Sequence, residues 1–219
     1  MRAAVIIFPG SNCDRDLLSA LSLAGHEATP IWHKETELPK NIDLVAIPGG
    51  FSFGDYLRCG AIAAKSPIFN EVIRHIDRGG YALGICNGFQ ILTEAGILPG
   101  ILQQNIGTKF ISKIIDLRVQ NTSSTFTHKY SSNCNISIPI AHHEGNYFAS
   151  PDELKKLKDK NCIAFKYINN PNGSSDDIAG ILSKNHRVLG MMPHPERHTE
   201  SAHGCQDGYP FFKGLLETS

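Results

Sequence analysis

Short apolar runs alternate with amphipathic segments through the first hundred residues of the chain. The runs "AAVIIF" (3–8) and "IDLVAIPGG" (42–50) are rich in branched residues and end close to Pro or Gly, which is typical of strands buried on both faces. A weaker third run, "YALGIC", covers 81–86. Leucine and alanine recur at helical spacing after the first run, and Gly25 ends that pattern. We therefore expect strands and helices in alternation.

Two further helices are predicted before residue 100. Apolar residues between Ala61 and Asp77 form one stripe, although Pro67 must kink or split that helix. Another helix should begin at Asn87 or Gly88 and include "FQILTEAG". This alternation predicts an α/β fold, with a doubly wound, mostly parallel sheet flanked by helices and joined by right-handed crossovers. Sites in such sheets lie at the carboxyl ends of the strands.

The pattern changes in the second half of the chain. "FISKIIDLRVQ" (110–120), "STFTHKY" (124–130) and "NISIPIAHHEGNYF" (135–148) predict antiparallel strands and hairpins that form a small extension of the sheet. "SPDELKKLKDKN" predicts a short exposed helix capped by Ser150. Later segments predict two strands joined by a turn through "NPNG", a strand in "RVLGMM" and a C-terminal helix in "GYPFFKGLLE".

Composition excludes several classes of protein. The chain has 219 residues, 41% of them hydrophobic, so it can bury a full core, and we expect one domain over 1–219. Its 21 basic and 21 acidic residues leave no charge excess for binding nucleic acid or an anionic membrane. The first apolar run is too short for a signal sequence or a membrane span, so a soluble, cytoplasmic protein is expected. Six scattered cysteines contain no C-x-x-C pair, which argues against a zinc knuckle or a disulfide scaffold.

A candidate nucleophile lies in "GICNG", residues 84–88. Cys86 stands between two glycines where a predicted strand meets a predicted helix, which is the form of a nucleophile elbow. A helix N-terminus favours a thiolate, and the backbone N–H of Asn87 is available to stabilise an oxyanion. The alternative is a buried structural cysteine in a glycine-rich strand end, so other features must decide.

The segment "MMPHPERH" offers a base and a residue to orient it. His194 and Glu196 are two positions apart, so they face the same side if the flanking prolines hold the segment extended. Glu196 would then fix the tautomer of the imidazole and favour its protonated form. Alone, such a pair is more often a surface contact. Both this pair and Cys86 follow predicted strands, however, so they can converge on one edge of a parallel sheet.

A glycine-rich segment, "PGGFSFGDYLRCG", follows the second predicted strand. Gly49 and Gly50 can turn backbone amides toward a ligand and supply a second oxyanion donor, although an ordinary turn would have the same composition. The cluster of His142, His143 and Glu144 has metal-binding side chains, but neighbours on a strand alternate faces, so no metal is expected there. Neither a Walker nor a dinucleotide fingerprint occurs, so this chain is not expected to bind ATP.

An elbow cysteine, a late His-x-Glu and a glycine loop, in that arrangement, resemble the class I, triad-type glutamine amidotransferases, which have a flavodoxin-like fold. The longer blocks "GGFSFGDYLRCGAIA", "LGICNGFQILTEAGILPG", "NPNGS" and "LGMMPHPER" are similar to the glutaminase subunits of phosphoribosylformylglycinamidine synthases, from de novo purine (IMP) biosynthesis. The resemblance begins at "FPGSNCDRD" and runs nearly to the C-terminus. Long blocks of this kind are more specific than the short cores shared by all triad glutaminases.

The resemblance implies a role for individual residues. Cys86 would attack the carboxamide of glutamine, giving a glutamyl thioester and ammonia. His194 would protonate the leaving group and then activate water, and Glu196 would hold His194. The resemblance also assigns oxyanion and glutamine-binding positions to Gly50, Asn87 and Gln90.

The resemblance also implies partners. Ammonia would pass to a separate large synthetase subunit, which uses ATP and Mg to convert formylglycinamide ribonucleotide into the amidine, and a small third subunit would bridge the two. No cofactor is expected in this chain. Weak activity is expected from the chain alone, since a partner could complete the site by closing a loop such as 51–58. One departure from the family is His143 in "AHHEG", where relatives carry glycine.

Two other interpretations stay open at the level of the sequence. A cysteine peptidase or stress protein of related fold would take its histidine from beside the nucleophile, where this chain has Asn87. A regulatory subunit that had lost turnover would be expected to lack a triad residue, and all three are present.

Overall fold

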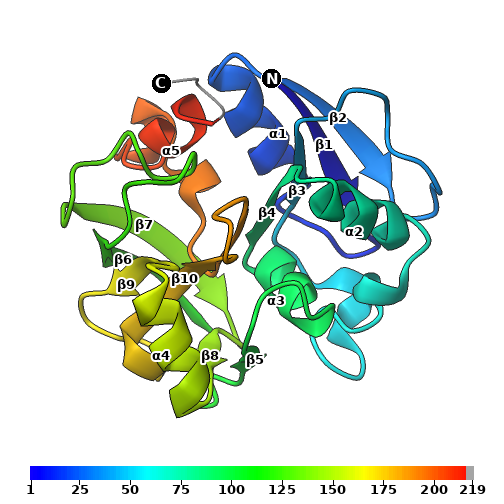
Figure 1. Ribbon diagram of the computed structural model, residues 1–219. Coiled ribbons are helices and arrows are strands. Elements are labelled where there is room, and N and C mark those ends of the chain that lie inside the picture. Colours follow the sequence, from blue (N-terminus) through cyan, green and yellow to red (C-terminus); the bar gives the residue numbers. More distant parts are fainter. Residues whose placement is uncertain (216–219) are drawn as a thin grey trace.

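The computed structural model describes residues 1–215, which form a nine-stranded sheet and a separate two-stranded sheet (Figure 1). Five neighbouring strands of the large sheet run parallel to one another. In spatial order they are β2 (Glu27–Trp32), β1 (Arg2–Ile7), β3 (Leu44–Ile47), β4 (Tyr81–Ile85) and β11 (Val188–Met191).

An antiparallel extension continues the same sheet beyond β11. Its strands are β10 (Ile178–Leu182), β9 (Ile163–Tyr167), β6 (Ile111–Val119) and β7 (Asn135–His142), in that spatial order. The small second sheet pairs β5 (Ile101–Gln103) with β8 (Asn146–Phe148). The predicted fold class, a mostly parallel α/β sheet with an antiparallel extension, is therefore confirmed.

The helices pack around the parallel half and over the extension (Figure 1). They are α1 (Asp14–Leu23), α2 (Phe69–Asp77), α3 (Asn87–Glu94), α4 (Pro151–Asp159) and α5 (Tyr209–Lys213). Helix α1 joins β1 to β2 and contacts α5, whereas α2 and α3 both contact the short 3₁₀ turn Ala63–Lys65. In the sheet, β2 lies on one side of β1, whereas β3 and then β4 lie on the other side. The connections from β1 to β2 and from β3 to β4 therefore run in opposite directions, and right-handed crossovers place α1 and α2 on opposite faces of the sheet. The sheet is doubly wound.

Burial follows the hydrophobic pattern that predicted the central strands. Every residue of β3, β10 and β11 is buried, as expected for strands covered on both faces. Pro67 separates the 63–65 turn from α2, so the predicted stripe does split in two. Ser150 caps α4 in a full capping box with Glu153, as the sequence indicates.

The segment 124–130 is not the strand that its β-branched and aromatic residues predict. It forms successive turns, in which the backbone N–H groups of Thr127 and His128 donate to the carbonyl of Ser124. The hydroxyls of Ser124 and Thr127 bond each other at 2.6 Å, and Phe126 stacks on Phe211. Local side-chain bonds of this kind compete with strand pairing. The predicted C-terminal helix forms over Tyr209–Lys213 as α5, and the last two residues of the predicted segment, Leu216 and Glu217, lie outside the described residues.

No helix within residues 1–215 is both long enough and apolar enough to span a membrane.

Gly88 tests the packing that positions α3 against the sheet. A Cβ at this position would lie 2.1 Å from the carbonyl oxygen of Ile47, at the end of β3. Gly88→Ala is therefore expected to destabilise the protein by about 1–3 kcal/mol through overpacking of backbone, which urea unfolding followed by circular dichroism would measure. Gly107→Ala is the matched control, since a Cβ there meets no atom within 4 Å. Equal stability losses in the two variants would contradict this account.

Candidate active site

Cys86 lies on a sharp turn between β4 and α3. Its backbone has φ 50° and ψ −105°, a positive φ that costs a non-glycine residue about 1–3 kcal/mol. Its N–H donates to the carbonyl of Met191, at the end of the neighbouring strand β11, at 2.7 Å. A Cβ on Gly84 would lie 2.6 Å from the backbone of Gly88, so the flanking glycines are required for space. The predicted nucleophile elbow is present.

His194 follows β11 and reaches the same edge of the sheet. Its Nδ1 lies 2.6 Å from Oε1 of Glu196, and both side chains are buried. Burial alone lowers the pKa of His194, but the carboxylate of Glu196 and the thiol of Cys86 outweigh it and raise this pKa well above its ordinary value. The arrangement therefore favours a protonated imidazole with a fixed orientation. The convergence expected from the two strand ends is observed.

The flanking prolines predicted an extended segment around His194 and Glu196. The structure shows that this segment is not extended. Pro195–Arg197 forms a 3₁₀ turn, and His194 precedes it with φ −105° and ψ 81°. Proline is compatible with the first position of a helical turn, because its fixed φ suits that turn and its missing N–H is not needed there. The turn folds Glu196 back onto the imidazole, so the predicted contact forms by a different local geometry.

Gly49 and Gly50 act mainly by leaving space. A Cβ on Gly49 would lie 2.7 Å from Cε1 of His194 and 3.4 Å from Cβ of Cys86. Gly50 has φ 151°, and a Cβ there would lie 2.7 Å from the carbonyl oxygen of Gly10. This close approach lets the base and the nucleophile meet over the end of β3. The sequence pattern indicated an amide donor at Gly50, and the structure places that residue in the cavity wall beside Cys86.

Asn87 and Gln90 belong to a hydrogen-bond network beside the elbow. Asn87 accepts from the N–H of Ser52 at 3.1 Å and donates to Gln90 Oε1 at 2.8 Å. Gln90 in turn donates to the carbonyl of Glu144 at 2.7 Å. Asn87 is also the first residue of α3, where a backbone N–H has no partner within the helix and is available to an oxyanion. The side chain of Asn87 thus has a structural role beside the nucleophile, and the imidazole comes from the end of β11.

Two hollows meet at Cys86, with Gly50, Phe51 and Ala141 in both walls. The first has a volume of about 210 Å³ and is completed by Asn12, Cys13, Phe110, His194 and Arg197. The second has a volume of about 140 Å³ and is completed by Asp55, Cys59, Gln90, His142, His143 and Glu144. The base therefore stands on one side of the thiol, and a group of acidic side chains stands on the other.

Cys13, Asp55, Cys59 and Arg197 were not singled out by the sequence patterns, and Glu144 was considered there only as part of a possible metal cluster. Cys13 and Arg197 meet at 3.1 Å between Sγ and Nη2, and Asp55 and Glu144 face the thiol of Cys59. Cys13 follows β1, which pairs with both β2 and β3, and such a topological switch point is where α/β proteins bind ligands. The position of Cys13 shortly after the first predicted strand is the signal in the sequence that could have identified this residue.

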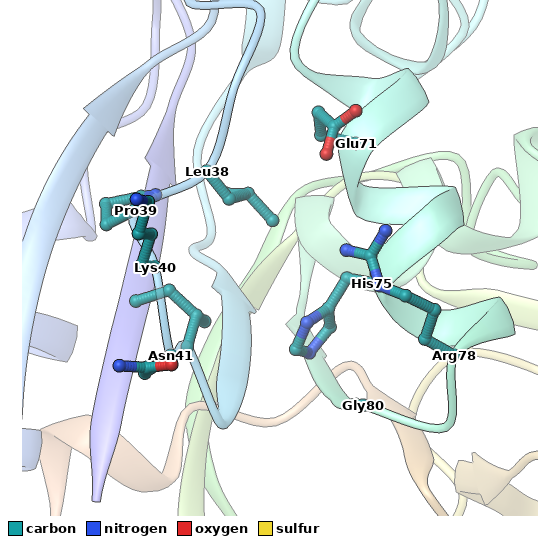
Figure 2. Close-up of a pocket in the computed structure, with 9 residues that line it drawn as sticks. Leu38, Pro39, Lys40, Asn41, Glu71, His75, Arg78 and Gly80 are labelled. Atoms are coloured by element: carbon teal, nitrogen blue, oxygen red, sulfur yellow. The ribbon is translucent and has the colours of Figure 1, made fainter.

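A larger hollow, of about 370 Å³, lies away from these residues (Figure 2). It opens at the amino ends of β3 and β4 and is lined by the loop 38–42 together with Glu71, His75, Arg78 and Gly80. His75 is already bonded to the carbonyl of Tyr81 at 3.1 Å. Since functional groups in parallel sheets gather at the carboxyl ends, this hollow is not part of the candidate site.

His142 and His143 point in different directions, as strand alternation predicts. His142 is buried and donates from Nδ1 to Asn105 Oδ1 at 3.0 Å, whereas His143 lies near the carbonyl of Thr108, 3.2 Å from its Nε2. Burial lowers the pKa of His142 to about 4, and the nearby His194 adds to this effect. His142 is therefore a neutral imidazole in the folded protein at neutral pH.

Fold and site together define a glutamine amidotransferase of the cysteine-triad class. Residues 1–204 match the family described as CobB/CobQ-like glutamine amidotransferase domain. Two relatives, from Ruegeria sp. and Ruegeria pomeroyi, are 58% and 60% identical over 98% of this chain and 97% of their own length. Both are named phosphoribosylformylglycinamidine synthase subunit PurQ. The chain belongs to the PurQ family of glutamine amidotransferases.

Solved structures agree with this assignment. A chain in the structure of PurLQS from Thermotoga maritima superposes with a TM-score of 0.91 at 42% identity, over 98% of this chain and 97% of that one. The glutaminase domain of a Trypanosoma brucei CTPS, which has bound acivicin, shares the fold with a TM-score of 0.62 at 14% identity, over 97% of this chain and 91% of that one.

The buried His142 predicts a pH dependence of stability. Its pKa falls from 6.5 in the unfolded chain to about 4 in the folded protein, so the unfolded chain binds more protons in this interval. The free energy of unfolding should therefore decrease as the pH is lowered from 6.5 to 4, by about 1.4 kcal/mol for each unit of pKa shift. His142→Gln should show a shallower decrease in urea titrations at several pH values.

His143→Gln removes the neighbouring imidazole, which is only partly buried, and should follow the wild type across the same interval. His194 contributes with the opposite sign near pH 6.5, because its raised pKa keeps it protonated in the folded protein while the unfolded imidazole is still titrating, so the slope due to His142 is best measured below about pH 5.5. Parallel curves for wild type and His142→Gln would show that another group causes the dependence.

Proposed function

We propose that this chain hydrolyses glutamine through a thioester on Cys86 and supplies the ammonia to the synthetase of a phosphoribosylformylglycinamidine synthase. One observation carries the proposal. The buried pair of His194 and Glu196, 2.6 Å apart, converges with a strained elbow cysteine at one edge of the sheet. Membership of the PurQ family supports the particular pathway.

The geometry supports a two-step displacement at the glutamine carboxamide. The Cys86 thiolate attacks the carbonyl carbon, and the backbone N–H of Asn87 stabilises the oxyanion, with Gly50 as the second donor. Protonated His194 gives its proton to the leaving nitrogen, so that ammonia departs and a glutamyl thioester remains. The neutral imidazole then takes a proton from water, and the hydroxide that forms releases glutamate and restores the thiolate.

Glu196 acts on this sequence through His194. It holds Nδ1, so that Nε2 faces the reacting atoms, and it stabilises the imidazolium that the first step requires. Both groups are buried, and the low local dielectric strengthens the attraction between the carboxylate and the imidazolium.

The second hollow suits the amino-acid end of the substrate. Asp55 and Glu144 present carboxylates there, on the side of Cys86 opposite His194, and an α-ammonium group would be attracted to them. Burial raises the pKa of Asp55, and the charge of Glu144 adds to this shift, so a bound cation would relieve the repulsion between the two carboxylates. Gln90 lines the same hollow and fixes the backbone at Glu144.

We infer a partner surface beside the two hollows, whose walls include the exposed rings of Phe51 and Phe110. Tyr56 and Leu57 are 74% and 89% exposed, and Phe51 and Phe110 are also exposed. Apolar side chains gathered in this way mark interaction sites. The loop 51–58 has positive φ at Phe53, Asp55 and Leu57, so it is a strained segment that a partner could rearrange. In the Thermotoga maritima relative, PurQ occurs in a complex named PurLQS. We infer corresponding large and small partners here, with ATP and Mg bound by the synthetase.

A cytoplasmic location is part of the same proposal. All six cysteines are free thiols, which suits a reducing compartment.

Cys86→Ala is expected to abolish glutamine-dependent amidine formation in the reconstituted complex, because no nucleophile remains. Added ammonium chloride should still support synthesis at the wild-type rate, since the synthetase receives its substrate directly. Cys205→Ser is the control, because Cys205 lies outside both hollows. Loss of ammonia-dependent synthesis with the complex intact on gel filtration would count against the proposal.

Glu196→Gln tests the orienting carboxylate. The change keeps the shape but removes the charge that favours the imidazolium, so kcat for glutamate release should fall by roughly 10²–10⁴ while KM for glutamine changes little. The exposed Glu200→Gln should retain wild-type kinetics. A change confined to KM would show that Glu196 binds substrate instead.

A further inference from the structure

Two buried asparagines hold the turn that carries Glu144, and neither has a part in the proposed chemistry. Asn105 lies between β5 and β6, and Asn172 lies in the turn between β9 and β10; they are 1% and 0% exposed. The turn 143–145 joins the paired residues of β7 to those of β8. Backbone groups in such a turn must find hydrogen-bond partners outside the strand ladder.

Side chains supply those partners. Nδ2 of Asn172 donates to the carbonyl of Gly145 at 2.8 Å, and Oδ1 of Asn105 accepts from the N–H of the same glycine at 3.1 Å. The carbonyl of Glu144 accepts from Gln90, on α3, at 2.7 Å. Both polar atoms of the peptide group that follows Glu144 are therefore held by side chains from other parts of the chain.

The other bonds of the two asparagines fix which way each amide faces. Nδ2 of Asn105 donates to the carbonyls of Lys109 and His142, at 2.8 and 2.9 Å, so Oδ1 is the atom left to accept from the turn. Oδ1 of Asn172 accepts from the N–H and the hydroxyl of Ser174, at 3.1 and 2.8 Å, so Nδ2 is left to donate. Rotating either amide would leave buried polar groups unpaired, which is costly.

These bonds relate Glu144 to the nucleophile. Glu144 lines the second hollow, on the side of Cys86 away from His194. Gln90, which holds the carbonyl of Glu144, belongs to the helix that begins directly after Cys86. The separation of the carboxylate from the thiol is therefore set by the frame of side chains around the turn.

We propose that Asn172 and Asn105 are positioning residues that make the site selective for the free α-ammonium group of glutamine, because they fix Glu144. The inference rests on the proposed function, in which Glu144 attracts that ammonium group. The "NPNG" turn, predicted from the sequence only as a connection between two strands, thus also supports the amino-acid end of the substrate hollow.

The test compares glutamine with glutaramate, which is glutamine without its α-amino group, in the reconstituted complex. Ammonia release would be measured for both substrates. Asn172→Ala should raise KM for glutamine at least roughly tenfold, the factor expected for one charged hydrogen bond. Its kcat should stay within about twofold, since binding lost equally from the ground and transition states changes KM alone. KM for glutaramate should stay within about twofold, because this substrate does not use Glu144.

Asn105→Ala should reduce the preference for glutamine in the same way. Asn121→Ala is the matched control, since this side chain is also 1% exposed but bonds the carbonyl of Asn161 and lines neither hollow. Circular dichroism would verify folding. If Asn172→Ala does not fold, Asn172→Asp replaces it, because an aspartate keeps the acceptor for Ser174 but loses the donor to the turn.

An unchanged preference for glutamine in folded Asn172 and Asn105 variants would overturn the proposal, and so would an equal loss of activity toward both substrates. Calorimetry of glutamine binding to the Cys86→Ala complex, with and without Asn172→Ala, makes the same comparison without turnover, and binding should weaken at least roughly tenfold. A wild-type complex that binds glutamine but releases no glutamate would contradict the proposed hydrolysis alone.

Discussion

The parallel pairing of β4 with β11 is the constraint on which the site depends. Met191 lies opposite Ile85 at the carboxyl ends of these strands, and the N–H of Cys86 donates to the carbonyl of Met191. This register delivers a nucleophile and an imidazole to one edge of the sheet from distant parts of the sequence. The elbow can hold its positive φ because a bond to β11 and the packing of α3 fix the turn from both sides.

Close packing at this edge of the sheet depends on glycines, which have no side chain. Gly84 and Gly88 let α3 approach the sheet, and Gly49 lets His194 and Cys86 meet. The same region carries the strain of Cys86 and the buried charge of Glu196, both of which oppose folding. The fully buried strands β3, β10 and β11 supply the hydrophobic stabilisation that offsets these costs. Stability in the sheet and reactivity at its edge are thus spatially separate.

The sequence by itself determined the elements and the chemical groups. Buried strands, the split at Pro67, the capping box at Ser150 and the glycines around Cys86 follow from local patterns of hydrophobicity and backbone restriction. It did not determine the turns of 124–130, since side-chain hydrogen bonds there outweigh strand propensity. Nor did it give the 3₁₀ turn that folds Glu196 onto His194, because proline fits extended and helical geometries alike. Only the tertiary structure brought Cys13 and Arg197 to the imidazole, since contacts between distant strand ends leave no periodic signal along the chain.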